Sequence, residues 1–536
     1  MSDSPAKMAR LYRWASLMLF AGVAVMSLWT LPDYGMCWDE FYRWEGGQQK
    51  LGYYRALLRG EDGQALLLDS ADAYPGFFDL SVALLDTVLP FGLLAIGHGM
   101  SLVFGLAALG GTWAIGRYLG GDRLGFWAVL FLLLMPRFYG QIFFNPKDVP
   151  FAAGMIWSLY FLLRWGRCLP RPRLGPTLML GVVLGLTLAL RIGGLVLFAY
   201  MGGYATFVLL RELLYERVPT KRWLMQVLQV AIHALIVLGV ALVVLYPWWP
   251  YIHSNPLSRI YETFTTVEAY PWKGTVLFQG SLDHGDDIPW YYVPTWLVIT
   301  LPEYFFFTTV VGLGLLLVNW RRAATYAFSV SGFPWVVIAV AAFFPVLYVI
   351  IRDSVLYNGI RHLMFVLPPL ACLSAWAWVC FWDWIAGRRA LKCAAGGILV
   401  LLIAMELVVL QRLHPYEYVY FNQFSGGMSS KAGRYTSDYW GISLLEAVRW
   451  LEEYVPEGDY KIEKSLASTR FTLYLPERFH LAEPENQPDF DISLTRSEMD
   501  VKPEGETIYT VERYGFPMAV VKDLRASPID SANAVD

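Results

Sequence analysis

The sequence has few charged residues and no signature of a metal or nucleic-acid site. Charged residues make up 16% of the 536 residues, where roughly 25% is usual for soluble domains. The five cysteines include no CxxC pair and have no metal-ligand spacing. The net charge of −3 gives no excess of basic residues for binding phosphates, so no nucleic-acid partner is expected. Hydrophobic residues reach 56%, and such a chain is predicted to be a polytopic α-helical membrane protein with lipid as its main solvent.

Apolar runs long enough to cross a bilayer, about 20 residues each, recur along the chain. They predict about eleven membrane-spanning helices. These lie near 14–31, 98–116, 124–141, 149–164, 174–190, 192–210, 224–246, 296–319, 333–351, 362–381 and 394–410. No small-residue cleavage site follows the first run, so we interpret it as a span and not as a signal peptide.

Lysine and arginine gather in every second connection between the predicted spans. The basic segments are 7–13, 117–123, 164–173, 211–222, 321–322 and 388–392. Basic short loops face the cytoplasm, so the long loops 32–97 and 247–295 and the C-terminal tail are expected on the outer side. The expected location is the inner (plasma) membrane of a bacterium, with the tail in the periplasm.

The composition divides the chain into a transmembrane domain, 1–410, and a soluble tail, 411–536. The tail is predicted to be a small extracytoplasmic α/β domain. It has an amphipathic helix at 443–454 and strands at 508–513 and 518–521 around a Tyr-Gly-Phe-Pro turn. In the first outer loop, 41–58 and the apolar stretch 77–96 are predicted to be helices lying along the membrane surface.

Asp39 and Glu40 follow the first span almost directly. Carboxylates just outside the hydrocarbon are costly unless they are solvated, paired or used in function. Asp39 could serve in catalysis, or it could only favour the start of the 41–58 helix. The two side chains lie about 100° apart around a helix, so we expect only one of them to point into a given site.

Lys147 and Asp148 lie in the stretch NPKDVP that opens the fourth span. Asn145 and Pro146 are typical of a helix start, whereas a lysine at this place opposes the helix dipole. A Lys–Asp pair at the lipid boundary therefore fits either a helix start or a site for phosphate, metal or both.

Further cations are predicted at the same membrane face. Arg191 lies between the fifth and sixth spans, Arg137 lies near the outer end of the third, and Arg361 and His362 open the tenth. Each arginine alone fits a snorkelling side chain or a salt bridge. Several cations on one face favour an anionic ligand held at the depth of the lipid headgroups.

Four stretches in order carry a resemblance to a known family. They are the Asp39-Glu40 pair, FNPKDVPF at 144–151, YNGIRHLMFVLPPL at 357–370 and HPYEYVYFNQ at 414–423. The chain resembles the GT-C superfamily of membrane glycosyltransferases, within the dolichyl-phosphate-mannose–protein mannosyltransferase-like clan. The last two stretches are similar to its bacterial, phospholipid carrier-dependent branch. The resemblance covers residues from about 14 to about 440.

The resemblance implies transfer of a sugar from a polyprenyl-phosphate carrier, with inversion, to an acceptor outside the cytoplasm. The acceptor class stays open between lipid, glycan and protein. By position, Asp39 would be the general base, Glu40 would support it, Asp148 would be a second acid near the substrate, and Arg361 would hold the lipid phosphate.

The predicted substrate-binding set is completed by Lys147, Arg191, Arg137 and His362. No nucleotide cofactor is needed, because the carrier arrives already charged with its sugar. Asp39, Glu40 and Asp148 could bind a divalent cation through oxygen ligands, and metal dependence stays open.

Two other classes compete with a transferase. A transporter or flippase of lipid-linked envelope precursors often shows internal repeats and polar residues near the middle of the membrane. An assembly factor that binds envelope proteins through its tail would leave the membrane-face charges unexplained. The notable charges cluster at one face, and this favours the glycosyltransferase.

Overall fold

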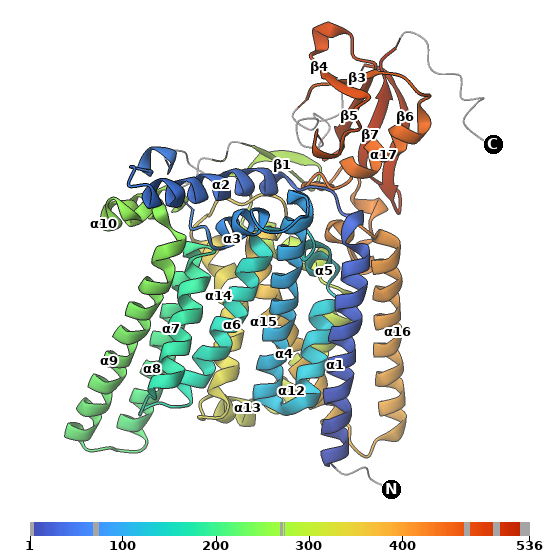
Figure 1. Cartoon of the computed structure of the whole chain (residues 1–536). Coiled ribbons are helices and arrows are strands. Elements are labelled where there is room, and N and C mark those ends of the chain that lie inside the picture. The colour runs from blue at the N-terminus through green and yellow to red at the C-terminus, as the bar shows by residue number, and fades with distance from the viewer. Residues whose placement is uncertain are drawn as a thin grey trace.

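A bundle of long helices forms most of the molecule, and a small sheet domain stands beyond one end of it (Figure 1). The computed structural model describes residues 5–67, 74–268, 272, 274–465, 472–496 and 504–525. Parts of both long outer loops and of the tail lie outside these residues. The architecture confirms the predicted class, a polytopic helical protein with a C-terminal α/β domain.

Seven helices in the described part are long and apolar enough to span a membrane. They are α1 (Pro5–Thr30), α4 (Leu93–Leu133), α8 (Val196–Leu214), α9 (Thr220–Leu245), α14 (Phe333–Ile351), α15 (Leu367–Trp384) and α16 (Arg389–Leu413). Helices α11 (Tyr292–Thr300) and α12 (Glu303–Val318) meet at a 107° bend and add an eighth if they form one span.

Each predicted span nevertheless falls on a helix of the bundle. The segments 149–164 and 174–190 fall on α6 (Asp148–Gly166) and α7 (Leu174–Leu188). Two more share α4, which breaks at Gly120 and Gly121. There the chain doubles back, and the two halves pack closely. A Cβ on Gly116 would come within 2.9 Å of the Gly125 Cα. Only small residues permit two helices to approach so closely.

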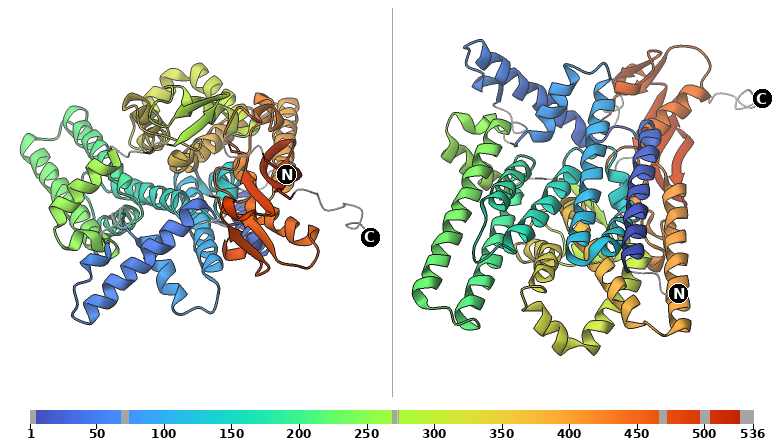
Figure 2. Two further views of the ribbon diagram at one scale, coloured as in Figure 1. Left: turned by 90° about the horizontal axis from the view of Figure 1, so that it is seen from above. Right: turned by 60° about the horizontal axis from the view of Figure 1, so that its bottom comes forward.

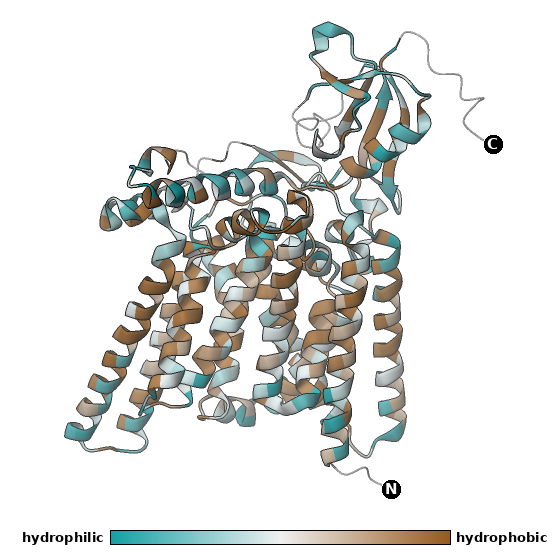
Figure 3. Cartoon of the chain, viewed as in Figure 1, coloured by the Kyte–Doolittle hydropathy of each residue, from teal (hydrophilic) through white to brown (hydrophobic). Residues whose placement is uncertain are grey.

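The outward faces of the bundle are apolar. Helices α9 and α16 expose large side chains such as Leu228, Leu235, Val400 and Leu401. Figure 3 shows this as a brown band across the middle of the helices. Soluble proteins rarely expose patches of this size, so the molecule is a multi-pass integral membrane protein.

Short elements cover the end of the bundle opposite the N-terminus (Figures 1 and 2). They include α2 (Trp38–Leu58), α3 (Phe77–Asp86), α10 (Pro256–Glu268) and the hairpin β1 (Thr275–Phe278) and β2 (Ser281–His284). The two predicted surface helices are thus present. The second is shorter than expected, because α3 ends at Asp86 and the chain enters α4 at Leu93. The α8–α9 connection and α13 (Trp320–Ala327) lie at the opposite end.

The tail folds as one helix, α17 (Leu444–Tyr454), against a five-stranded mixed sheet of order β4-β3-β5-β7-β6. The strands are β3 (Tyr460–Glu463), β4 (Phe479–Ala482), β5 (Phe490–Leu494), β6 (Glu506–Arg513) and β7 (Phe516–Asp523). This confirms the predicted helix and the predicted strand pair. Tyr514 and Gly515 turn the β6–β7 hairpin with positive φ angles of 54° and 69°.

The chain between α16 and α17 runs back onto the end of the bundle before it enters the sheet domain. Tyr418, Tyr420 and Phe421 are buried there, and the Asn422 side chain donates to the carbonyls of Val298 and Leu301 at 2.7 and 2.8 Å. The first part of the tail therefore belongs to the packed end of the membrane bundle.

Candidate active site

Asp39 lies in the first turn of α2, on the covered end of the bundle. Its Oδ2 accepts a hydrogen bond from Nη2 of Arg361 at 2.7 Å. Burial works against ionisation of this carboxyl, but Arg361 and Lys147 outweigh it and hold the pKa of Asp39 below its usual value. The side chain is 22% exposed, so Asp39 offers an ionised carboxylate that a ligand can reach.

Asp148 begins α6 and is sealed from solvent, with 1% of its side chain exposed. Asn145 prepares this helix start, because its Oδ1 accepts from the backbone N–H groups of Lys147 and Asp148 at 3.0 and 2.7 Å. The carboxylate binds Nη1 of Arg191 at 2.5 Å and lies 3.5 Å from Nε of Arg361. Asp148 thus holds two arginines in place from below the surface.

Arg361 is the centre of the arrangement and joins the two carboxylates. It follows a tight turn in which Asn358 and Gly359 have positive φ angles of 58° and 70°. Its side chain is only 4% exposed, and its Nε pairs with Asp148 at 3.5 Å without the geometry of a hydrogen bond. A guanidinium has five N–H donors, so Arg361 can bind a further anion while it keeps Asp39.

Lys147 is half-buried and acts on Asp39 as a second cation. We define Asp39, Lys147, Asp148, Arg191 and Arg361 as the charged cluster. The Lys147 amine is 4.7 Å from the ring centroid of Tyr74. It is the main reason that the pKa of Tyr74 is lowered, against the effect of burial. Three cations face two carboxylates, which leaves an excess of one positive charge.

A second group of charges next to Tyr74 was not anticipated from the sequence. Arg43 on α2 lies 5.5 Å from the Tyr74 ring and binds Asp79 on α3 at 2.8 Å. The fully buried amine of Lys50 lies 3.8 Å from the same carboxylate. Neither Arg43 nor Lys50 was singled out from the sequence, and both are buried where α3 packs on α2.

Glu40 points away from the charged cluster, as expected for one member of the pair. Its Oε2 accepts from the backbone N–H of Cys37 at 2.8 Å, and its Oε1 lies 3.3 Å from Nε2 of His98. The first contact belongs to a capping box at the start of α2. Glu40 therefore fixes the helix on which Asp39 stands.

Arg137 is also outside the charged cluster, and its expected place within the third span was wrong. Helix α4 ends at Leu133, and Pro136 starts the separate short helix α5 (Pro136–Gln141), because proline cannot continue a helix but suits its first turn. The buried guanidinium donates to the Tyr420 carbonyl at 2.9 Å and lies 4.9 Å from the Trp296 ring. It binds the returning tail segment.

His362 adjoins Arg361 in the chain but faces the ring of Tyr357, with the ring centroids 4.5 Å apart. No three His, Cys, Asp or Glu side chains converge as metal ligands within the described residues. The carboxylates of Asp39 and Asp148 meet on Arg361 instead. Carboxylates that are each paired with an arginine in this way do not fit a divalent cation.

Trp440, in the tail, completes the surroundings of the charged cluster. Its ring centroid is 4.2 Å from Cζ of Arg361, and its indole N–H donates to Oε1 of Gln141 at 3.2 Å. Sequence reasoning missed this residue, because a tryptophan in a loop of a polar segment carries no periodic signal.

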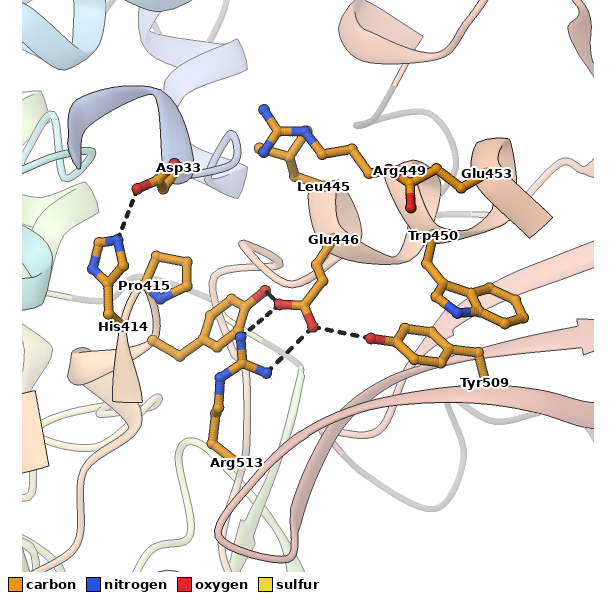
Figure 4. A pocket seen from close by; sticks show the side chains of 11 residues that line it. Asp33, His414, Pro415, Leu445, Glu446, Arg449, Trp450, Glu453, Tyr509 and Arg513 are labelled. Atoms are coloured by element: carbon orange, nitrogen blue, oxygen red, sulfur yellow. Dashed lines mark hydrogen bonds and ion pairs between the residues drawn. The ribbon is translucent and has the colours of Figure 1, made fainter. Parts of the chain in front are cut away.

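A cleft of about 420 Å³ separates α17 and β6 of the tail from the ends of α1 and α16 (Figure 4). Several of its charged side chains pair with neighbours in the cleft. Glu446 accepts from Arg513, Tyr416 and Tyr509 at 2.7, 2.7 and 3.1 Å, and His414 contacts Asp33 at 2.9 Å. Of these contacts, the hydrogen bond from Tyr416 to Glu446 joins the chain after α16 to the sheet domain.

Comparison with known proteins gives matches in structure only. No protein-family model and no curated protein sequence matches the chain. ArnT from Cupriavidus metallidurans bound to undecaprenyl phosphate is 14% identical, with a TM-score of 0.47 over 94% of this chain and 97% of that one. The Archaeoglobus fulgidus oligosaccharyltransferase in complex with zinc and sulfate is 12% identical, with a TM-score of 0.45 over 87% and 66%. At these identities both likenesses concern the fold alone.

Proposed function

We propose that this protein is a membrane glycosyltransferase that takes a sugar from a polyprenyl-phosphate carrier and transfers it to a hydroxyl-bearing acceptor. The observation that carries the proposal is the convergence of Asp39 and Asp148 on Arg361, at 2.7 and 3.5 Å. These residues come from three distant parts of the chain and meet at the covered end of the bundle. At that place a lipid phosphate lies in the headgroup region while its sugar projects outward.

The charges suit such a donor. A sugar–phosphate–lipid diester carries one negative charge, and the charged cluster has an excess of one positive charge. The ion pairs of Arg361 with Asp39 and Asp148 use Nη2 and Nε. The guanidinium has further N–H donors, and guanidinium groups bind phosphate oxygens in pairs. We therefore assign the phosphate to Arg361, with Lys147 and Arg191 beside it.

The same cations can stabilise the phosphate group that leaves when the glycosidic bond breaks. Cleavage between the anomeric carbon and the phosphate oxygen leaves a polyprenyl phosphate with an additional negative charge. Cations already in place stabilise charge that develops during the reaction, without a general acid. Asp148 keeps Arg191 and Arg361 in position for this purpose.

Asp39 is the proposed general base. It is the exposed carboxylate of the charged cluster, whereas Asp148 is sealed. It takes the proton of the acceptor hydroxyl while the hydroxyl oxygen attacks the anomeric carbon, and the displacement inverts that carbon. The donor phosphate offsets part of the field of Arg361 and Lys147, so Asp39 becomes a stronger base once the donor is bound. Glu40 supports it by fixing the start of α2.

The test is to incubate the purified protein in nanodiscs with a panel of polyprenyl-phosphate sugars and candidate acceptors. Mass spectrometry follows release of polyprenyl phosphate and the mass of the acceptor. The proposal predicts release and a matching gain on an acceptor with at least one donor. Movement of intact carriers across proteoliposomes without any cleavage would favour a flippase instead.

A further inference from the structure

One buried carboxylate organises the segment 438–443, which joins the packed end of the bundle to α17. Asp438 is fully buried. Its Oδ1 accepts from the Tyr418 hydroxyl and from the N–H groups of Trp440 and Gly441, and its Oδ2 accepts from the N–H and hydroxyl of Ser443. Five donors thus converge on one carboxyl group and hold the turn in one conformation.

The turn brings Trp440 against Arg361 and against the residue that precedes Asp39. Its carbonyl accepts from the backbone N–H of Trp38 at 3.2 Å, one residue before Asp39. Its ring lies over the guanidinium of Arg361 at 4.2 Å.

The third contact of Trp440 leads to Asp148. The indole N–H donates to Oε1 of Gln141 at 3.2 Å, and the same oxygen accepts from Asn145 at 2.7 Å. Asn145 in turn donates to Oδ2 of Asp148 at 3.2 Å. Trp440 thus touches Arg361 directly. It is linked to Asp39 through the neighbouring residue Trp38, and to Asp148 through the hydrogen bonds of Gln141 and Asn145.

We propose that Trp440 is a positioning residue for donor binding, and that the Asp438 turn makes this part of the tail a component of the phosphate site. The inference rests on the proposed function, because it assumes that Arg361 binds the lipid phosphate. The indole covers one face of the guanidinium and leaves its edges for anions. Without that cover, Arg361 can rotate into a bidentate pair with one carboxylate and become unavailable to phosphate.

The experiment compares Trp440→Leu and Trp440→Phe with the unaltered protein. Binding of polyprenyl phosphate without sugar is measured first, followed by KM for the donor, KM for the acceptor and kcat. Loss of a desolvated cation–π contact predicts that Trp440→Leu raises the dissociation constant for polyprenyl phosphate about tenfold. KM for the donor should rise in parallel, while KM for the acceptor stays unchanged. Trp440→Phe keeps an aromatic face and should restore most of the affinity.

Trp450→Leu is the matched control. Trp450 lies on α17 of the same tail and stacks on Tyr454 and Tyr509, with ring centroids 4.6 and 4.3 Å apart. Its loss should lower the melting temperature and leave donor affinity unchanged. Equal loss of affinity in Trp440→Leu and Trp450→Leu would show that the tail acts only through stability and would overturn the inference.

Asp438→Asn preserves side-chain volume and tests the turn if Trp440→Leu does not accumulate in the membrane. Like Trp440→Leu, it should raise the dissociation constant for polyprenyl phosphate. Normal affinity in a folded Asp438→Asn or Trp440→Leu protein would contradict the positioning role. If the unaltered protein does not bind polyprenyl phosphate at all, the proposed function fails, and this outcome is distinct from the two above.

Discussion

Asp39 and Arg361 are 322 positions apart in the chain, and their side chains form an ion pair of 2.7 Å. The pair joins the proposed base to the proposed phosphate ligand before any substrate arrives. A phosphate that binds Arg361 therefore weakens the hold of the arginine on Asp39. Donor binding and activation of the base are coupled through this contact.

Arg361→Ala should raise the dissociation constant for polyprenyl phosphate more than tenfold, since a charge-assisted contact is worth about 1.5–3 kcal/mol. Arg361→Lys should recover little if the contact is bidentate. Arg259→Ala is the control, because Arg259 lies on α10 and pairs with Glu262 on the surface. Unchanged affinity in Arg361→Ala would make Arg361 a structural partner of Asp39 and leave Arg191 or Lys147 as the phosphate ligand.

Lys147→Met should move the acid limb of the kcat/KM profile to higher pH. Burial opposes ionisation of Asp39, and Arg361 and then Lys147 lower its pKa. Loss of one cation raises that pKa, and a base stops working as pH falls through it. Lys461→Met, at an exposed position of strand β3, should leave the acid limb in place. If the acid limb of the Lys147→Met profile stays at the same pH or moves to lower pH, Lys147 does not lower the pKa of the proposed base.

His414→Gln should destabilise the protein in a pH-dependent way. Burial lowers the pKa of His414, but Glu417 and Asp33 outweigh it, so the pKa lies above 6.5. Its charged form therefore contributes stability that is complete below pH 6.5 and is lost as pH rises through the folded-state pKa. The melting temperatures of the variant and the unaltered protein should differ most below pH 6.5 and converge at higher pH.

His480→Gln is the control for that series, because its pair with Asp459 is largely exposed and contributes little. A difference between His414→Gln and the unaltered protein that grows with rising pH would contradict the bridge from Asp33 to Glu417.

Reporter fusions test which side of the membrane carries the charged cluster. A reporter active only outside the cytoplasm should be active at the C-terminus and silent after Arg173, which precedes α7 at the opposite end of the bundle. A silent C-terminal fusion would place Asp39 and Arg361 on the cytoplasmic side and exclude an extracytoplasmic acceptor.

The sequence predicted those parts of the fold that depend on local pattern. Apolar length located the spans, amphipathic character located α17, and strand-like stretches around the Tyr-Gly-Phe-Pro turn located the β6–β7 hairpin. The end of α4 was missed, because Phe138, Phe143 and Phe144 continue its apolar run. These residues are buried against protein and not against lipid, and hydropathy does not distinguish the two.

The site was predictable where its residues share a membrane face, as Asp39, Asp148 and Arg361 do. It was not predictable where contacts depend on tertiary packing. Trp440 reaches Arg361 only because the tail returns to the bundle, and Arg43 becomes buried only when α3 covers α2. Spacing indicated that one of Asp39 and Glu40 would face away, but only the hydrogen bond from Cys37 identifies it as Glu40.

Asp39→Asn tests the central claim most directly. The substitution keeps the shape and one accepting oxygen but removes most of the basicity, and loss of a general base typically costs about 10²–10⁴ in rate. The measurement is single-turnover sugar transfer by protein saturated with donor, beside the dissociation constant for polyprenyl phosphate. We predict a loss of transfer within that range with donor affinity retained. Full transfer by Asp39→Asn would contradict the account, because asparagine replaces aspartate well as a helix-capping residue but not as a base.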